Sequence, residues 1–194
     1  LLIDRLAQKY PGLVRAFHHK KNLGTNISLT ELFREAKNDW IFFLPADKQI
    51  LPDSIRDYLA AAEAGADMVL GWRAKRADPF HRNFFNWAYR TAIQLLLGFS
   101  FQDATASDLY KKSVLDQITF ESQGRLLQAE IAIKASLLGY QVKEIPVKHF
   151  PRTAGKQTGI KPKALWLSFV DLLRVAPKIN QMKKARFTNL SHSR

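Results

Sequence analysis

The order of apolar and polar positions predicts alternating helices and strands in the first part of the chain. Apolar residues recur at helical spacing in 2–9, 25–36 and 53–63, and short apolar runs typical of strands lie at 13–17, 40–44 and 67–72. The run 40–44 is continuous and ends at Pro45, which favours a strand buried on both faces. This alternation is typical of an α/β domain with a mostly parallel sheet flanked by helices.

The rest of the chain continues the alternation, with more strongly apolar helices. Helices are expected at 80–97, 126–138 and 164–175, and strands at 109–110 and 140–147. The apolar side chains of 80–97 suit a protein core, and a lipid-binding groove is the alternative. Residues 148–163 are basic and rich in Gly, Thr and Pro, which predicts a mobile loop.

The last helical segment has an unusual distribution of polar residues. Residues 164–175 are apolar except for Ser168, Asp171 and Arg174. These three recur at every third position and form one narrow polar stripe. Two interpretations are open. The helix either lies in a membrane interface with its aromatic side chains, Trp166 and Phe169, inserted, or packs as a terminal helix on the domain.

Composition narrows the class of protein. The chain has 194 residues, of which 46% are hydrophobic, so it can bury one sizeable core and is not intrinsically disordered. The lack of cysteine excludes a disulfide scaffold, a thiolate zinc site and a cysteine nucleophile. No apolar stretch reaches the roughly 18 residues of a membrane-spanning helix, and no signal-peptide pattern opens the sequence. We therefore expect a cytosolic or membrane-surface protein.

The charge is strongly positive and uneven along the chain. Lys and Arg number 30 against 17 Asp and Glu, a formal net charge of +13, and residues 161–194 alone carry +7 of it. Such a surplus indicates an anionic partner, which could be nucleic acid, an anionic lipid surface or a phosphate-bearing substrate. Nucleic acid is not expected, because no helix-turn-helix, zinc finger or aromatic RNA-binding motif accompanies the charge.

The most informative segment for chemistry is 42–49, with the sequence Phe-Phe-Leu-Pro-Ala-Asp-Lys-Gln. Asp47 lies just past the carboxyl end of a predicted buried strand, where open α/β sheets bind their ligands. A carboxylate there can hold a divalent cation, Mg²⁺ or Mn²⁺, that bridges the oxygens of a nucleotide diphosphate. A simple turn-forming role for Asp47 is the alternative.

Several further motifs follow one another in a characteristic order. They are Asn22-Leu23-Gly24, the 40–49 segment, Gly71-Trp72-Arg73 with Arg76, Asp78, Pro79 and Arg82, then Asp103, Glu130, Gly139, Glu144-Ile145-Pro146-Val147, His149, Arg152 and Gly155. Their order and spacing over about residues 2–165 resemble the family 2 glycosyltransferases with a GT-A (Rossmann-like) fold. The similarity is greatest to the branch of dolichyl- and polyprenyl-phosphate sugar synthases.

The resemblance implies an inverting glycosyltransferase on the cytoplasmic face of a membrane. It would move a sugar from a nucleotide-diphosphate donor to a polyprenyl-phosphate or other membrane-proximal acceptor. The implied roles are cation binding by Asp47, donor diphosphate binding by Gln49, Arg152 and Lys156, acceptor phosphate binding by Arg73, Arg76 and Arg82, and general-base catalysis by Asp103 or Glu130. With an acceptor that is already anionic, Asp103 would only orient it. The three acceptor-side arginines could instead be solvated surface charges.

The sequence also departs from the family pattern. Pro45 stands where the first Asp of the metal motif is usual, and the loop 103–108 is one residue short and lacks Gly-Phe. The family's opening strands, with Pro-x-x-Asn-Glu and Asp-Asp-Gly-Ser, have no counterpart, so we expect an N-terminally truncated sheet. An inactive remnant serving as an interaction module is therefore the alternative function. The expected parts are a partial GT-A domain at 1–160, an amphipathic helix at 161–182 and a basic disordered tail at 183–194.

Overall fold

The structure, a computed structural model, describes residues 1–74, 80–103, 106–122, 124, 126–151 and 162–192. The helices are α1 (Leu2–Lys9), α2 (Thr25–Glu35), α3 (Ile55–Glu63), α4 (Phe80–Leu97), α5 (Lys112–Asp116), α6 (Leu127–Leu137) and α7 (Pro162–His192). The strands are β1 (Trp40–Phe43), β2 (Met68–Arg73), β3 (Asp108–Lys111) and β4 (Val142–Val147). Most elements agree with the sequence prediction within a few residues.

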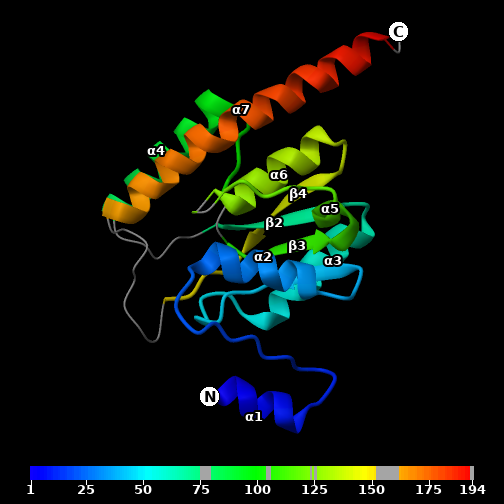
Figure 1. Ribbon diagram of the computed structural model, residues 1–194, viewed down its shortest axis with the longest axis vertical. Coiled ribbons are helices and arrows are strands. Elements are labelled where there is room, and N and C mark those ends of the chain that lie inside the picture. Colours follow the sequence, from blue (N-terminus) through cyan, green and yellow to red (C-terminus); the bar gives the residue numbers. More distant parts are fainter. Residues whose placement is uncertain (75–79, 104–105, 123, 125, 152–161, 193–194) are drawn as a thin grey trace.

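The four strands form one mixed sheet in the order β1-β3-β2-β4 (Figure 1). Strand β3 pairs antiparallel with both β1 and β2, and β2 pairs parallel with β4. Strands β1, β2 and β4 therefore run in the same direction and β3 runs against them. As a result, the carboxyl ends of β1, β2 and β4 meet the amino end of β3 at one edge of the sheet, which we call the carboxyl edge.

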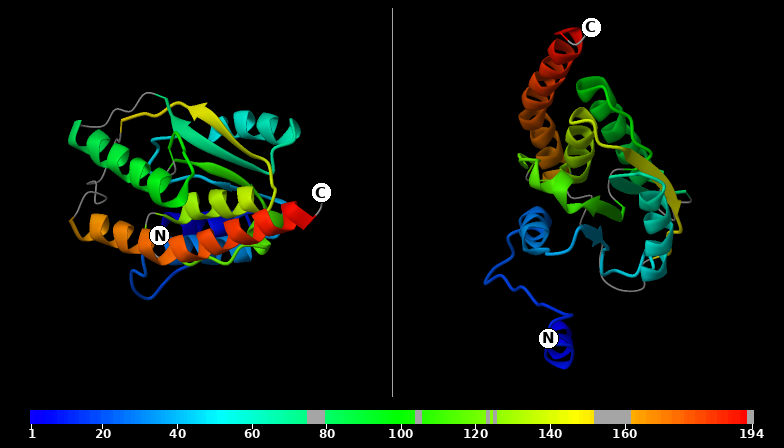
Figure 2. Two further views of the ribbon diagram at one scale, coloured as in Figure 1. Left: turned by 90° about the horizontal axis from the view of Figure 1, so that it is seen from above. Right: turned by 90° about the vertical axis from the view of Figure 1, so that its right-hand side faces the viewer.

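Each face of the sheet has its own apolar core. Met68 and Leu70 of β2 pack with α2, α4, α6 and α7, whereas Val69 points to the opposite face and packs with α3. This alternation follows from the pleat of a strand, which sends successive side chains to opposite sides. Figure 2 shows the sheet between α3 on one side and α6 with α7 on the other. The α/β architecture predicted from the sequence is confirmed.

Two strand predictions were wrong in detail. Residues 13–17 form no strand and instead contact α2 through side chains, for example where Arg15 lies 3.4 Å from Glu35. Strand β1 is only half-buried along its length, not buried on both faces. The reason is its position at the edge of the sheet, where β3 is its partner among the described strands.

Helix α7 is longer than the sequence suggested. It passes through Pro177 and continues to His192, so the disordered tail expected from residue 183 is wrong as far as His192. Proline removes a helical hydrogen bond, but Val175 and Ile179 on either side of it are fully buried in the core and hold the helix in place. In the part of the chain that the structure describes, no helix is both long and apolar enough to span a bilayer.

The second half of α7 is tied to two neighbouring helices. The Lys183 ammonium donates a hydrogen bond to the carbonyl of Leu97 at the end of α4. The Arg186 guanidinium donates to the carbonyl of Ser136 near the end of α6 at 2.7 Å. Basic side chains near helix carboxyl ends satisfy carbonyls that lack an intrahelical partner, so these two bonds attach the basic end of α7 to the ends of α4 and α6.

The packing of α7 beyond Pro177 can be tested by a truncation in the core. Ile179→Ala should lower the free energy of unfolding by about 2–4 kcal/mol, because it leaves a cavity against α6. Gln181→Ala, at an exposed position two residues further along α7, should change it by less than about 0.5 kcal/mol. Urea unfolding followed by circular dichroism measures both values. Equal effects would show that this part of α7 is not packed.

Candidate functional site

The carboxyl edge of the sheet collects residues that lie far apart in the sequence. Asp47 follows β1, Arg73 ends β2 and Phe150 follows β4. Asp103 precedes β3 and reaches the same edge because β3 runs in the opposite direction. Ligands of open α/β sheets bind at this kind of edge, so it is the candidate functional site.

The Asp47 loop is a tight turn at the end of β1. The Oδ1 atom of Asp47, whose side chain is half-buried, accepts the backbone N–H of Gln49 at 3.2 Å. Between them Lys48 has φ 59°, in the left-handed backbone region that residues other than glycine rarely adopt. The turn therefore holds the Asp47 carboxylate at a defined position on the carboxyl edge.

Gln49 connects this turn to β4. Its side-chain amide donates to the carbonyl of Phe150 at 3.3 Å, and the backbone N–H of Phe150 donates to the carbonyl of Gln49 at 2.9 Å. Gln49 is buried, so in this geometry it positions the loop, and diphosphate binding by Gln49 remains a prediction. Arg152 and Lys156 lie outside the described residues, although Arg152 follows Phe150 by only two positions in the chain.

Arg73 and Asp103 form a buried ion pair. The Nε and Nη2 atoms of Arg73 lie 2.6 and 3.0 Å from the two oxygens of Asp103, and the side chains are only 7% and 3% exposed. The sequence assigned one residue to the acceptor phosphate and the other to base catalysis, but it did not predict their pairing. A carboxylate held on both oxygens by a guanidinium is a weak proton acceptor, which favours an orienting role for Asp103.

Glu144 of β4 supports the loop that carries Asp103. Its carboxylate accepts the backbone N–H of Gln102 at 2.7 Å. Burial raises the pKa of Glu144, and the hydrogen bonds from the amides of Gln102 and Asp103 oppose this shift. Residues of β2 and β4 thus both bind the loop that leads into β3.

The two other arginines predicted for the acceptor phosphate are Arg76 and Arg82. Arg76 lies outside the described residues, and the side chain of Arg82 on α4 does as well.

Glu130 holds a loop and has no exposed surface. Its two oxygens accept the backbone N–H groups of Glu121 and Ser122, each at 2.9 Å, and Lys134 one turn further along α6 lies 2.6 Å away. Burial raises the pKa of Glu130 to about 7 and lowers the pKa of Lys134 to about 8. The geometry therefore gives no support to the general-base role that the resemblance implied for Glu130, because the carboxylate is closed off from substrate.

Asp171 of α7 binds the same loop from the other side. It accepts hydrogen bonds from the Ser122 hydroxyl, at 3.1 Å, and from the backbone N–H of Gly124. The side-chain amide of Asn26 in α2 donates to the Gly124 carbonyl. The loop thereby joins α2, α6 and α7. Sequence reasoning missed this role, for which the available signal was an acidic residue inside an apolar helix.

Asp108 is a second buried carboxyl that sequence reasoning did not single out. One oxygen accepts the Tyr110 hydroxyl at 2.8 Å and the side-chain amide of Gln128, while the other oxygen is buried with no hydrogen-bond partner among the residues that the structure describes. Burial raises the pKa of Asp108 to about 7. In the sheet register Asp108 faces Phe43 of β1 and Leu70 of β2, so a carboxyl that is often protonated lies just beneath the carboxyl edge.

A divalent cation fits the Asp47 turn only with help from a substrate. Among the residues that the structure describes, no three His, Asp or Glu side chains are grouped closely enough to hold a metal ion. Mg²⁺ is commonly held by one or two carboxylates together with substrate phosphates. Because a carboxylate is the oxygen donor that Mg²⁺ and Mn²⁺ prefer, Asp47 suits a cation shared with a diphosphate.

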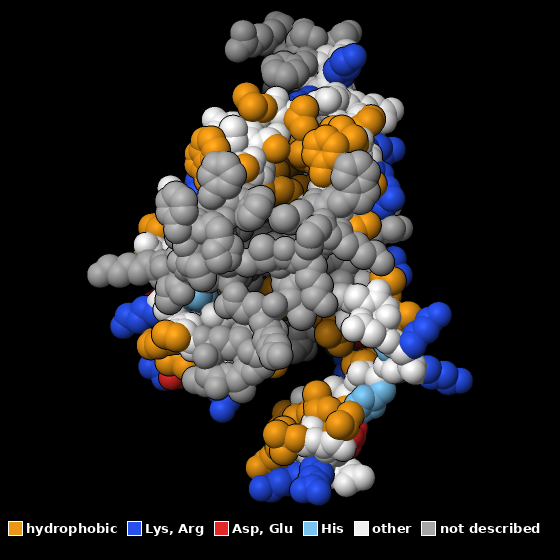
Figure 3. Space-filling view, turned by 90° about the vertical axis from the view of Figure 1, so that its left-hand side faces the viewer, with side chains coloured by type: hydrophobic (Ala, Val, Ile, Leu, Met, Phe, Trp, Pro, Cys, Tyr) orange, Lys and Arg blue, Asp and Glu red, His pale blue; other side chains and the backbone are white. Residues whose placement is uncertain are grey.

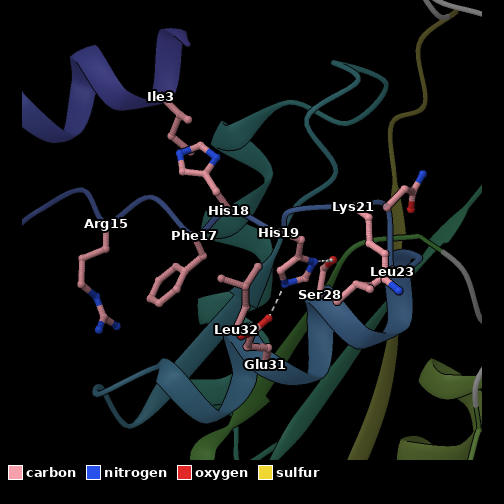
Figure 4. Close-up of a pocket in the computed structure, with 11 residues that line it drawn as sticks. Ile3, Arg15, Phe17, His18, His19, Lys21, Leu23, Ser28, Glu31 and Leu32 are labelled. Carbon is pink, nitrogen blue, oxygen red and sulfur yellow. Dashed lines mark hydrogen bonds and ion pairs between the residues drawn. The ribbon is translucent and has the colours of Figure 1, made fainter.

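A separate pocket of about 390 Å³ lies between α1, the segment that follows it and α2 (Figure 4). On its α2 side, His19 Nε2 lies 2.5 Å from Glu31, and His19 Nδ1 lies 3.4 Å from the Ser28 hydroxyl. The turn beside it is stabilised by the Asn22 side chain, which accepts the N–H of Gly24, whose φ of 92° favours glycine. His19 is therefore partly buried and anchors the chain to α2.

Solved structures confirm the fold class. Glucosyl-3-phosphoglycerate synthase from Mycobacterium tuberculosis, crystallised with UDP, has a TM-score of 0.58 and 14% identity, over 90% of this chain and 60% of that chain. The same enzyme with Mn²⁺, UDP and phosphoglyceric acid has a TM-score of 0.52 and 12% identity, over 95% of this chain and 58% of that chain. The sheet and helices described above are thus a GT-A fold, as the sequence predicted.

The chain belongs to glycosyl transferase family 2, which residues 2–124 match. Polyprenol monophosphomannose synthase from Mycolicibacterium smegmatis (strain ATCC 700084 / mc(2)155) is 27% identical over 171 residues, which cover 79% of this chain and 63% of that protein. Undecaprenyl-phosphate 4-deoxy-4-formamido-L-arabinose transferase from Pseudomonas fluorescens (strain Pf0-1) is 28% identical over 136 residues, which cover 70% of this chain and 39% of that protein. The chain therefore spans less than two thirds of the length of each relative.

The ion pair at the carboxyl edge predicts strong coupling between its two residues. Arg73→Met or Asp103→Leu alone should cost about 3–5 kcal/mol of stability, because each leaves a buried charge without its partner. The double variant should cost much less than the sum of the two, because an apolar pair leaves no buried charge. Chemical denaturation of the four proteins gives the coupling energy. Additive costs would contradict a buried pair.

Asp108 predicts a pH-dependent stability. Its folded pKa of about 7 exceeds its usual value of 3.8, so the folded protein binds the proton more tightly and its stability falls as pH rises from about 4 to 7. Asp108→Asn should remove this fall, so its stability advantage over the parent should grow by about 2–3 kcal/mol as the pH rises from 5 to 7. Urea unfolding at several pH values measures the gain. Asp53→Asn, at an exposed position, should show the same dependence of stability on pH as the parent. If Asp108→Asn also showed the parent's dependence, the raised pKa of Asp108 would be refuted.

Proposed function

We propose that this protein is an inverting glycosyltransferase that moves a sugar from a nucleotide-diphosphate donor to a polyprenyl phosphate. The observation that carries the proposal is the gathering of Asp47, Arg73, Asp103 and Phe150 at the carboxyl edge of a family 2 fold. The similarity to a polyprenol monophosphomannose synthase and to an undecaprenyl-phosphate transferase supports the lipid-phosphate acceptor.

The reaction needs charge stabilisation on the donor side. An acceptor phosphate oxygen forms a bond to the anomeric carbon while the bond to the nucleotide diphosphate breaks, and the diphosphate leaves with the electron pair. A divalent cation bound by Asp47 would supply positive charge to that leaving group. The assignment is supported by glucosyl-3-phosphoglycerate synthase, an enzyme with this fold that was crystallised with both Mn²⁺ and UDP. Arg152, two residues beyond Phe150, and Lys156 would add bidentate or point-charge contacts to the same phosphates.

The acceptor side follows from the ion pair. A polyprenyl phosphate is anionic at neutral pH and needs no base, so Asp103 serves to hold Arg73 in place. Arg73, with Arg76 and Arg82, would then bind the acceptor phosphate. Such an acceptor lies in a membrane, which places the protein on a membrane surface, and we propose the cytoplasmic face because nucleotide sugars are made in the cytoplasm.

The proposal is tested by transfer and by binding in the complete protein. Transfer from a panel of nucleotide sugars to a polyprenyl phosphate, followed by mass spectrometry of the lipid, should yield one glycosylated product with inverted anomeric configuration. No product with any donor, together with no nucleotide-sugar binding, would favour an inactive remnant that serves as an interaction module.

Asp47→Asn should remove the metal dependence of donor binding. In calorimetry of the complete protein, Mn²⁺ should tighten binding of the nucleotide sugar at least about tenfold in the parent, because the cation bridges carboxylate and diphosphate. The variant should show the same weak binding with and without Mn²⁺. Asp53→Asn, an exposed Asp outside this turn, is the matched control. Unchanged Mn²⁺ dependence in Asp47→Asn would remove Asp47 from the role.

A further inference from the structure

Helix α7 turns its polar stripe toward the protein and exposes apolar side chains. Ser168 and Asp171, two of the three residues in the stripe, are buried. In contrast, Leu167, Phe169 and Leu173 are 48%, 48% and 54% exposed. An ordinary surface helix keeps its apolar residues on the core side, whereas α7 buries Leu172, Val175 and Ile179 and in addition exposes apolar side chains on its outer side. The inward polar groups are satisfied because Asp171 binds the 122–124 loop.

Helix α4 adds exposed apolar side chains next to α7. Trp87 is 60% exposed and Leu95 is 79% exposed. The two helices pack together where the Lys183 ammonium of α7 reaches the Leu97 carbonyl and lies 5.3 Å from the ring centre of Phe99. In Figure 3 hydrophobic side chains gather in the upper part of the molecule, the part in which Figure 1 shows α4 and α7. We call the exposed apolar residues of these two helices the α4–α7 surface.

The exposed charges along α4 and α7 are basic, although Arg90 also lies close enough to the half-buried Glu144 of β4 to interact with it. Exposed basic residues follow its apolar part along α7, and they are Arg174, Lys178, Lys184 and Arg186. Arg90 is exposed on α4. The sequence of α4 has no acidic residue, and that of α7 has only the buried Asp171. An apolar area beside a cationic area fits a partner that offers both hydrocarbon and negative charge.

We propose that the α4–α7 surface docks onto an anionic lipid bilayer. Phe169, Leu173 and Trp87 insert at the boundary between headgroups and acyl chains, and the basic residues of α7 contact the anionic headgroups. The inference rests on the proposed function, since a lipid-linked acceptor brings the protein to a bilayer. It extends that function by naming a two-helix surface in place of a single terminal helix.

The charge pattern argues for a bilayer over a second copy of the chain. Two copies that met through this surface would bring Lys178 and Lys184 of both copies together, and like charges at an interface oppose association. The helix also does not need its outward side to stay in place, because Asp171, Lys183 and Arg186 already bind it to three other parts of the protein. Leu167, Phe169 and Leu173 thus stay about half-exposed on the outer side of a helix that is bound through its inner side.

Vesicle flotation of the 194-residue chain tests the proposal without any substrate. The chain should bind vesicles of phosphatidylglycerol and phosphatidylcholine more tightly than pure phosphatidylcholine, and about 0.5 M salt should weaken the binding. Phe169→Ser/Leu173→Ser should reduce binding at least about tenfold, because it removes inserted apolar area. Leu13→Ser, which removes a leucine that is 84% exposed and lies outside α4 and α7, should change it less than about twofold.

A second variant keeps the test independent of the first. Lys178→Glu/Lys184→Glu should lose about tenfold or more on anionic vesicles and little on neutral ones, since it changes only the electrostatic part. Thermal unfolding by circular dichroism checks that each variant is folded. Equal vesicle binding by the parent and both double variants would overturn the proposal. It would also be overturned if the parent did not bind vesicles but formed a dimer in light scattering that Phe169→Ser/Leu173→Ser abolished.

The outcome is separable from that of the proposed function. If the chain binds anionic vesicles through this surface but the complete protein transfers no sugar, the docking surface stands and the transferase proposal falls. If transfer to a short, water-soluble polyprenyl phosphate occurs without vesicle binding by the chain, the transferase stands and the docking surface falls.

Discussion

The buried ion pair between Arg73 and Asp103 is the interaction on which the carboxyl edge depends. Two charges that are almost completely removed from water are tolerated only when each satisfies the other. Their bond fixes the end of β2 to the loop that enters β3, and Glu144 of β4 holds the backbone of the same loop. The Asp47 turn is bound to the end of β4 through Gln49. Polar contacts among four strands thus give a rigid edge on which a phosphate-bearing substrate can be positioned.

A second polar assembly organises the helical layer. Glu130 and Asp171 approach the 119–124 loop from α6 and α7, and Asn26 reaches it from α2. Because these polar groups point inward beside the buried Leu172, Val175 and Ile179, α7 is held to the body without using the apolar side chains on its outer side. The same arrangement thereby explains both the burial of acidic residues that resemble catalytic ones and the exposure of an apolar surface. The carboxyl edge and the α4–α7 surface are built from different sets of contacts.

The sequence predicted the order of the elements well, because apolar spacing within a segment reflects local geometry. It failed where the answer depends on a neighbour. Strand β1 looks like a central strand, but its burial is set by its place at the edge of the sheet. Pro177 looks like a helix end, but buried side chains on both sides of it keep α7 continuous. For the site, Asp47 and Asp103 were identified individually, whereas the pairing of Arg73 with Asp103 depends on the reversed direction of β3.

By itself, the sequence determined the class of fold, the family and the surplus of positive charge, since these depend on composition and on motifs in order along the chain. Only the tertiary structure decided which carboxylates face a possible substrate and which hold the protein together. Glu130 and Asp108 are acidic residues like any other until the core closes around them and raises the pKa of each. The direction in which α7 faces was likewise decided by packing. The polar side chains of its stripe could form their hydrogen bonds either with water or with the loop that Asp171 binds.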